Sequence, residues 1–568
     1  FGSSLGSSRC RLATGLCYCL APRQAMATDP CLAHLVAPED DLTAPVEGRD
    51  VLVGRGALLA RGRLVGGIIG TVLVGIVLLG LGASKVFAVR HGNVLRHEAV
   101  VQLEEHAGSE SGHAPEEASA TKVAGAGGHT CADRFIAPPK PKTVGEHNGV
   151  ALQEVCYSGD GPFHAYILGD WGALYEDGRV KAASHLSHRW GQAYKFIWPV
   201  DENAQVRIAN EMQKRAVKSK PDYVLNVGDN FYWAGVNDYC GAEDISDLYS
   251  QGGNDVYNKH KVNQFKVLYE EMYKGEGIDG KQWLGVLGNH DYGGWRLDHA
   301  WDQAIGYTWG KQEFNTGRWM TPALYYSAKV NYPDFSVDYY FMDSNVWDAM
   351  DVDDQSTHNI CGKAHNKADA ACPGGPKDLW SCPEWFDKLW KEQKVWLRDL
   401  ASRSTADWRI VVTHFPPYWG KDDWKELATS LELDLIVTGH RHSQFMRQMK
   451  DGNGTIIWPE WKMNVALTVG FTDFLDPTAW VVSGGGGGVT SEHVPSNNGT
   501  DDQYGFMDMT LSKETLKIEA ISHGGQLRRT IVVDHAYPHS RSTTTEPTTT
   551  AKAAETTGSV AGNGDASE

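Results

Sequence analysis

Five short apolar segments between residues 164 and 442 each end in side chains that can bind a metal ion. The clearest example ends at residues 228–232, with the sequence GDNFY. An apolar run that stops at Gly-Asp is typical of a buried strand with a carboxylate at its carboxyl end. In open α/β sheets that edge is where ligands bind. Taken alone, the pair is equally well explained by a strand-to-turn junction in which Asp229 caps the next helix.

Short apolar strands alternate with amphipathic stretches between residues 160 and 530, which predicts a layered α/β domain. A helix is expected after Pro199, where Val206, Ala209 and Met212 recur at helical spacing. The strands are predicted at 164–169, 222–228, 283–288, 336–343, 409–414, 433–438, 479–483 and 505–511.

Residues 64–84 form an uncharged apolar run before this domain. As a helix the run would extend about 30 Å, enough for a bilayer core. A signal-peptide core and a buried helix are the alternatives, but both are usually shorter. A slight excess of arginine before the run predicts a type II signal anchor, with the remainder extracellular or in a secretory or lysosomal lumen. Cleavage after Ala83 or Ala88 would release a soluble protein.

The other segments outside the domain have compositions typical of disordered or linking chain. Residues before Met26 are set aside as leader or fragment end. The predicted organisation is a disordered tail at 1–63 (with 1–25 as leader), the membrane span at 64–84, a stalk at 85–155, the catalytic domain at 156–535 and a Ser/Thr-rich disordered tail at 536–568.

Six cysteines follow the apolar run, and an even count on an oxidising side allows up to three disulfides in fifteen possible connectivities. They are Cys131, Cys156, Cys240, Cys361, Cys372 and Cys382. Sequons at Asn453 and Asn498 predict glycosylation on surface loops.

The formal charge of −18, from 53 basic and 71 acidic residues, argues against nucleic-acid binding. It also gives no general attraction for anionic substrates, so phosphate chemistry would need a local positive charge such as metal ions.

The polar residues at the strand ends are too many for turn chemistry alone, and together they predict a metal site. Carboxylate, amide, imidazole and phenolate donors suit iron, manganese or zinc. Seven donors exceed what one ion with open positions can use, so two ions bridged by Asp229 are expected. Such a pair can clamp a phosphoryl group and activate a water or hydroxide. The donors are Asp170, Asp229, Tyr232, Asn289, His414, His440 and His442.

The blocks GDWG, GDNFY, GNHD, VVTHFPP and GHRH, in this order, resemble the five blocks of the metallophosphoesterase superfamily. The tyrosine of GDNFY makes the chain similar to purple acid phosphatases, in particular to their small, tartrate-resistant type-5-like branch. The resemblance extends over residues 160–530.

This resemblance implies a four-layer α/β-β/α sandwich and a binuclear centre of Fe(III) with Fe(II), Zn(II) or Mn(II). It also implies that His290 is no ligand but stabilises the transferring phosphoryl group and protonates the leaving oxygen. The implied ligands are Asp170, Tyr232 and His442 for the ferric ion, Asn289, His414 and His440 for the divalent ion, and Asp229 as the bridge.

Two regions depart from the family's pattern. Mammalian members have a second histidine about nine residues beyond the first histidine of the fourth block, where this chain offers Asp422 and Asp423. Asp423 either takes part in proton transfer or belongs to a solvated loop. Residues 347–385 look like an insertion, either a lid or a surface excursion, and its His358 and His365 are predicted to be solvated.

The expected function is that of a membrane-anchored acid phosphatase with a monomeric catalytic domain, which hydrolyses phosphomonoesters by attack of a metal-bound hydroxide. One alternative is a phosphodiesterase or nucleotide phosphatase of the same fold, against which Tyr232 weighs. The other is a non-catalytic membrane anchor protein with a phosphatase-like domain, against which the complete ligand set weighs.

Overall fold

The computed structural model describes the chain from residue 122 to residue 537, with gaps. No helix among the described residues is long and apolar enough to cross a membrane. The predicted span at 64–84, the tail at 1–63, the sequon at Asn453 and, apart from its first two residues, the tail predicted at 536–568 all lie outside the described residues. Those residues are 122–124, 130–176, 178–182, 197–236, 238–241, 263–294, 296–355, 358–447 and 474–537.

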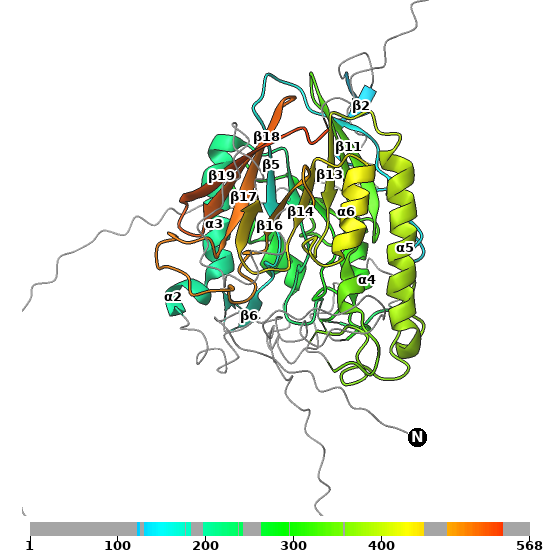
Figure 1. Cartoon of the computed structure of the whole chain (residues 1–568). Coiled ribbons are helices and arrows are strands. Elements are labelled where there is room, and N and C mark those ends of the chain that lie inside the picture. The colour runs from blue at the N-terminus through cyan, green and yellow to red at the C-terminus, as the bar shows by residue number, and fades with distance from the viewer. Residues whose placement is uncertain are drawn as a thin grey trace, which may run out of the picture. The chain divides into compact units, whose positions relative to one another are not determined.

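Two large sheets form the centre of the domain (Figure 1). In spatial order the first contains β1 (Lys122–Ala124), β2 (Thr130–Ala132), β4 (Val155–Cys156), β11 (Tyr326–Asn331), β12 (Ser336–Phe341), β13 (Trp408–Val412), β14 (Leu435–Thr438), β16 (Ala479–Ser483) and β15 (Gln444–Arg447), while β3 (Val150–Ala151) pairs with β11. The second contains β10 (Trp319–Met320), β9 (Gln282–Gly285), β8 (Tyr223–Asn226), β5 (Phe163–Leu168), β17 (Gly505–Leu511), β18 (Thr515–Ser522) and β19 (Leu527–Asp534). A separate hairpin joins β6 (Leu174–Glu176) to β7 (Arg179–Lys181).

Neighbouring strands are parallel from β12 through β13 and β14 to β16 in the first sheet, and from β5 through β8 and β9 to the edge strand β10 in the second. All eight predicted strands are present, with ends shifted by a few residues at most. Parallel strands buried on both faces require near-continuous apolar sequence. That requirement explains why the sequence predicts all of these strands except the two-residue β10.

The two sheets pack face to face through alternate residues of their strands. Ala165 and Ile167 of β5 belong to the same buried cluster as Tyr339 and Phe341 of β12. Tyr326 stacks on Phe341, with ring centroids 4.4 Å apart. Because successive side chains of a strand point to opposite faces, the other residues of these strands face the helices.

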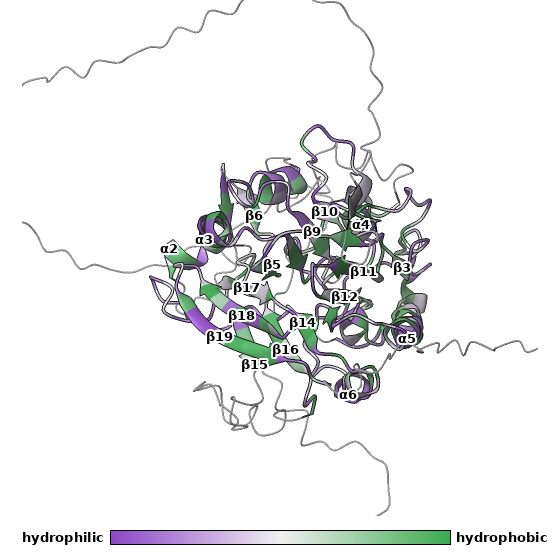
Figure 2. Ribbon diagram, turned by 90° about the horizontal axis from the view of Figure 1, so that it is seen from above, coloured by the Kyte–Doolittle hydropathy of each residue, from purple (hydrophilic) through white to green (hydrophobic). Residues whose placement is uncertain are grey.

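Helices cover the outer face of each sheet. The helical and 3₁₀ or π segments are α2 (Trp198–Asp201), α3 (Ala204–Ser219), η3 (Phe265–Glu270), α4 (Trp301–Gly306), η4 (Tyr307–Trp309), η5 (Asn345–Asp348), η6 (Leu379–Ser381), α5 (Cys382–Ala401) and α6 (Lys421–Ser430). Ile208 and Met212 of α3 pack against Tyr166 of the second sheet, which confirms the helix predicted after Pro199. α5 and α6 lie together beside the first sheet (Figure 1), and in Figure 2 α3, α5 and α6 carry hydrophilic residues among their apolar ones.

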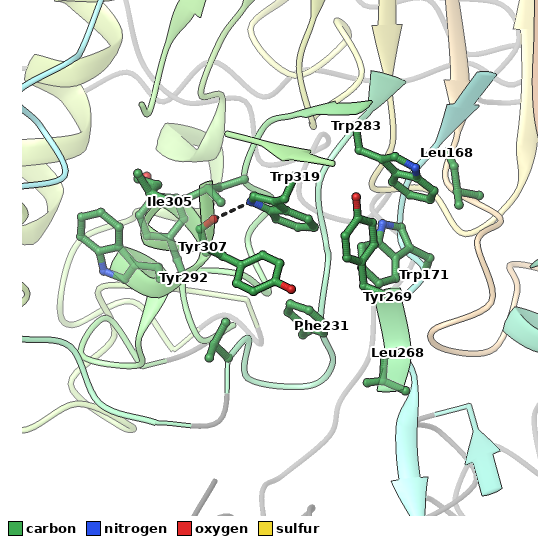
Figure 3. Close-up of a cluster of buried hydrophobic side chains, with 14 of the residues drawn as sticks. Leu168, Trp171, Phe231, Leu268, Tyr269, Trp283, Tyr292, Ile305, Tyr307 and Trp319 are labelled. Atoms are coloured by element: carbon green, nitrogen blue, oxygen red, sulfur yellow. Dashed lines mark hydrogen bonds between the residues drawn. The ribbon is translucent and has the colours of Figure 1, made fainter. Parts of the chain in front are cut away.

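A cluster of large aromatic side chains packs between the second sheet and its covering segments (Figure 3). Trp171, Trp283 and Trp319 are almost fully buried there, with tryptophan ring centroids 5.9 Å apart for Trp171 and Trp283. The indole nitrogen of Trp319 donates to the carbonyl of Ala304 at 2.7 Å. Trp171 directly follows Asp170, so this packing holds the first strand end in place.

All six cysteines that follow the apolar run are paired, as Cys131–Cys156, Cys240–Cys372 and Cys361–Cys382. The prediction of up to three disulfides is confirmed, and one of the fifteen connectivities is now assigned. The Cys361–Cys382 bridge closes a loop within the 347–385 insertion, and Cys240–Cys372 joins the insertion to the loop after β8.

Replacing Leu397 by alanine is expected to lower the free energy of unfolding by about 2–5 kcal/mol, because Leu397 is fully buried between α5 and the first sheet. Val395 is on the same helix and 67% exposed. Val395→Ala is therefore the matched control and should change stability by about 0.5 kcal/mol or less. Urea denaturation of both variants measures the difference, and equal losses would contradict the proposed packing of α5.

Candidate metal centre

The carboxyl ends of five parallel strands, from both sheets, meet at one place. Asp170 follows β5, Asp229 and Tyr232 follow β8, and Asn289 follows β9, all in the second sheet. His414 follows β13, and His440 and His442 follow β14, in the first sheet. The structure therefore brings the seven predicted ligands together from three strand ends of one sheet and two of the other.

One group of donors surrounds the hydroxyl of Tyr232. This hydroxyl lies 2.8 Å from Oδ2 of Asp229, 3.2 Å from Oδ1 of Asp170 and 3.3 Å from Nε2 of His442. One ligand atom each from Asp170, Asp229 and His442 lie within 4.8 Å of one another. This group contains the ferric-ion ligands that the family resemblance implies.

A second group is centred on the amide oxygen of Asn289. Nε2 of His414 lies 3.1 Å from this oxygen, and Nδ1 of His440 lies 3.3 Å from it. Nε2 of His414 is also 3.3 Å from Oδ1 of Asp229. Asp229 therefore touches both groups through different oxygens, as a bridging carboxylate would.

The backbone is strained at three of the ligands. Asp170, Asp229 and His440 have φ values of 59°, 52° and 68°, a left-handed conformation that non-glycine residues seldom adopt. Such strain concentrates at functional sites. A close approach adds to it, because a Cβ on Gly439 would lie 2.6 Å from Oδ2 of Asp170. The Gly-Asp and Gly-His pairs of the sequence thus have a steric cause.

Burial and mutual charge shift the pKa values of these groups. Burial, and then the charge of Asp229, raise the pKa of Asp170. Burial opposes ionisation of Asp229 too, but His414 and His290 hold its pKa well below the usual range. Against the effect of burial, the charge of Asp229 raises the pKa of His414 to about 9. A buried set of this kind gains stability from a cation, which would displace the protons now shared among the ligands.

His290 lies beside the ligands. Its Nδ1 is 2.5 Å from the carbonyl oxygen of Trp233, and its ring centroid is 4.4 Å from that of Tyr232. The backbone NH of His290 donates to Oδ1 of Asp229 at 2.9 Å. Because a carbonyl only accepts, Nδ1 carries a proton and Nε2 is the nitrogen at which the ring can gain or lose one.

Two supporting groups were not predicted from the sequence. Nδ1 of His414 lies 2.8 Å from the carbonyl oxygen of Val227, which orients that ring. The carboxylate of Asp291 accepts from the backbone NH groups of Gly288 and Asn230 at 2.8 and 2.9 Å, which joins the loops after β8 and β9. Asp291 belongs to the GNHD block, so the block itself was the available signal.

The prediction that His358 is solvated is wrong. It is 9% exposed, and its Nδ1 lies 3.3 Å from the amide nitrogen of Asn289. His365 is exposed, in agreement with the prediction. No periodicity or motif marked His358, because its position depends on how the insertion folds back onto the domain.

Residues 163–444 match the family model for the calcineurin-like phosphoesterases. The chain carries a calcineurin-like phosphoesterase domain. The chain is 21% identical to tartrate-resistant acid phosphatase type 5 of Homo sapiens over 355 residues, 59% of this chain and 89% of the relative. It is also 21% identical to the Mus musculus protein over 345 residues, 58% of this chain and 85% of the relative. The resemblance indicated by the five blocks is thus confirmed.

Two solved structures are similar to this chain at 15% sequence identity. One is GAP50, the anchor in the inner membrane complex of Plasmodium, with a TM-score of 0.40 over 66% of this chain and 89% of the other. The other is purple acid phosphatase PPD1 from seeds of yellow lupin (Lupinus luteus), with a TM-score of 0.34 over 68% of this chain and 56% of the other.

The phosphoesterase family implies a binuclear metal centre, and the side chains present fit one. The buried donors are oxygen and nitrogen atoms of the types that bind iron, zinc and manganese. The close approach of Gly439 to Asp170 forms part of a cradle that any larger residue would fill. The pair Cys240 and Cys372, which lies near Asp302, is disulfide-bonded and so offers no thiolate to a metal.

Asp423 makes structural contacts from the first turn of α6. Its Oδ2 accepts from the indole nitrogen of Trp390 and from Nζ of Lys394, both at 2.7 Å and both on α5. Asp422 is exposed. The residue lies in the first turn of α6 and not in the solvated loop that was predicted as one alternative, and its contacts favour a structural role over one in proton transfer.

Replacing Asp423 by asparagine is therefore expected to leave kcat/KM unchanged and to cost up to about 1 kcal/mol of stability, as the loss of a half-exposed ion pair does. Steady-state kinetics between acid and neutral pH, with thermal melting in parallel, measure both quantities. A displaced pH profile with unchanged stability would instead assign Asp423 to proton transfer.

Proposed function

We propose that this protein is an acid phosphatase that hydrolyses phosphate monoesters at a centre of Fe(III) with Fe(II), Zn(II) or Mn(II). One observation carries the proposal: the hydroxyl of Tyr232 lies between Asp170, Asp229 and His442. A phenol in that place is a ligand for a hard, highly charged ion. It is the feature that separates the purple acid phosphatases, as the sequence resembles them, from other metallophosphoesterases.

The two ions, when bound, would polarise the phosphate and supply a nucleophilic water for in-line attack. The ligands that would hold the ferric ion are Asp170, Tyr232 and His442, those for the divalent ion are Asn289, His414 and His440, and Asp229 would bridge.

The residues of the chain that act on the substrate follow from the same geometry. His290 is held through Nδ1 by the carbonyl of Trp233, so its Nε2 can carry a proton to the leaving oxygen. In its charged form the same ring stabilises the transferring phosphoryl group. The almost complete burial of Asp229, Asn289 and His414 excludes bulk water, which strengthens every electrostatic interaction in the site.

The cellular context is part of the proposal. We infer that residues 64–84 anchor the chain with the phosphatase domain outside the cytoplasm, in the extracellular space or a secretory or lysosomal lumen. Three disulfides support an oxidising compartment. Asn498 is exposed and so is available for a glycan.

Metal analysis of the purified full chain, together with hydrolysis assays from acid to neutral pH, tests the function. The proposal predicts two metal ions per chain, one of them iron, and hydrolysis of aryl phosphate monoesters that is fastest in acid. A metal-free, folded and inactive protein would establish the non-catalytic alternative. Preference for a diester such as bis(p-nitrophenyl) phosphate would establish the phosphodiesterase alternative.

A further inference from the structure

One residue of the 347–385 insertion, His358, lies at the metal centre. His358 is buried, with Nδ1 3.3 Å from the amide nitrogen of Asn289 and its ring centroid 5.7 Å from that of His290. It thus contacts the amide group whose oxygen lies near His414 and His440.

The insertion holds His358 in a fixed position. The backbone NH of Ile360 donates to the carbonyl of Asp348 at 2.8 Å. Next to His358, the side chain of Asn359 accepts from the NH of Cys361 at 3.0 Å and donates to the carbonyl of Asp351 at 2.8 Å. The Cys361–Cys382 disulfide then joins this turn to the start of α5.

The contact decides which way the amide of Asn289 points. An amide can ligate a cation only through its oxygen. A rotation of 180° about the Cβ–Cγ bond of Asn289 would direct the NH₂ group towards the cation instead. The NH₂ group needs an acceptor, and Nδ1 of His358 is one when the ring carries its proton on Nε2. Oδ2 of Asp348 is 3.7 Å from the same nitrogen, which is too far for a hydrogen bond.

We propose that His358 is a positioning residue for the divalent-ion site, which holds the amide oxygen of Asn289 towards His414 and His440. The insertion is then neither a surface excursion nor only a lid, because it supplies the hydrogen-bond acceptor for the amide group of Asn289. This inference rests on the proposed function. Groups that orient metal ligands are typically worth 10–100-fold in metal affinity or activity.

Three substitutions test the proposal. His358→Phe keeps a ring but removes the acceptor, whereas His358→Asn retains an acceptor oxygen where Nδ1 stands. His365→Phe is the matched control, since His365 is an exposed histidine of the same insertion. The measurements are the Kd of Zn²⁺ for protein depleted of its divalent ion, by chelator competition, and the visible absorption band of the ferric site.

The expected result is a Kd raised about 10–100-fold in His358→Phe, with the visible band retained. His358→Asn should recover most of this loss, and His365→Phe should match the wild type. An unchanged Kd in His358→Phe, loss of the band together with Zn²⁺ affinity, or no recovery in His358→Asn would each overturn the positioning role. Failure of the proposed function looks different, because it shows in the wild type itself, which would then bind no metal pair or would prefer diesters to monoesters.

Discussion

Replacing Asp229 by asparagine is expected to abolish phosphatase activity, lowering kcat/KM by a factor of about 10³ or more. Asp229 is fully buried, with one oxygen 2.8 Å from the hydroxyl of Tyr232 and the other 3.3 Å from Nε2 of His414. Asparagine keeps the size but not the negative charge, and its NH₂ group cannot ligate a cation. A thousandfold loss corresponds to about 4 kcal/mol of transition-state stabilisation, the scale on which charge-stabilising groups act.

Metal content and kinetics should change together in this variant. We expect fewer than two ions per chain, measured by elemental analysis, along with the lost activity. Asp334→Asn is the matched control, because it makes the same change at an exposed position between β11 and β12. An Asp229→Asn protein that retains two ions and normal turnover would show that Asp229 is not the bridge.

The strand ends could be predicted because the same physical requirements shape the sequence and the site. Parallel strands that are buried on both faces have nearly continuous apolar sequences. Gly439, next to His440, has no side chain because a Cβ there would meet the carboxylate of Asp170. An apolar run that ends in glycine followed by a metal-binding residue therefore indicates both a buried strand and a close contact at its end.

Other parts of the fold leave weaker traces in the sequence. β19 (Leu527–Asp534) is the edge strand of its sheet, and most of its residues are at least partly exposed, so its apolar signal is weak and it was not predicted. His358 is 69 residues away from Asn289 in the sequence, and a disulfide and several backbone hydrogen bonds of the insertion bring the two together. Local sequence patterns carry no information about contacts between residues so far apart in the chain.

Replacing Tyr232 by phenylalanine is expected to remove the visible absorption of the iron-loaded protein entirely. The purple colour of the family that the chain resembles comes from charge transfer between a tyrosine phenolate and Fe(III), and phenylalanine has no oxygen to supply it. Burial, and then the charges of Asp170 and Asp229, raise the pKa of Tyr232 far above its usual value. The phenolate can therefore form only against a strong positive charge at this position.

The direction of that pKa shift gives the experiment a second readout. The phenol is protonated in the metal-free protein at neutral pH, so binding of Fe(III) must release its proton, and iron affinity should fall as the pH is lowered. Tyr232→Phe should release one proton fewer per iron bound, measured by titration in weak buffer. Tyr292→Phe is the control, since Tyr292 is equally buried and donates to Asp343 at 2.8 Å, outside the ligand set. An unchanged spectrum in Tyr232→Phe would mean that the iron is held by other residues, whatever the activity.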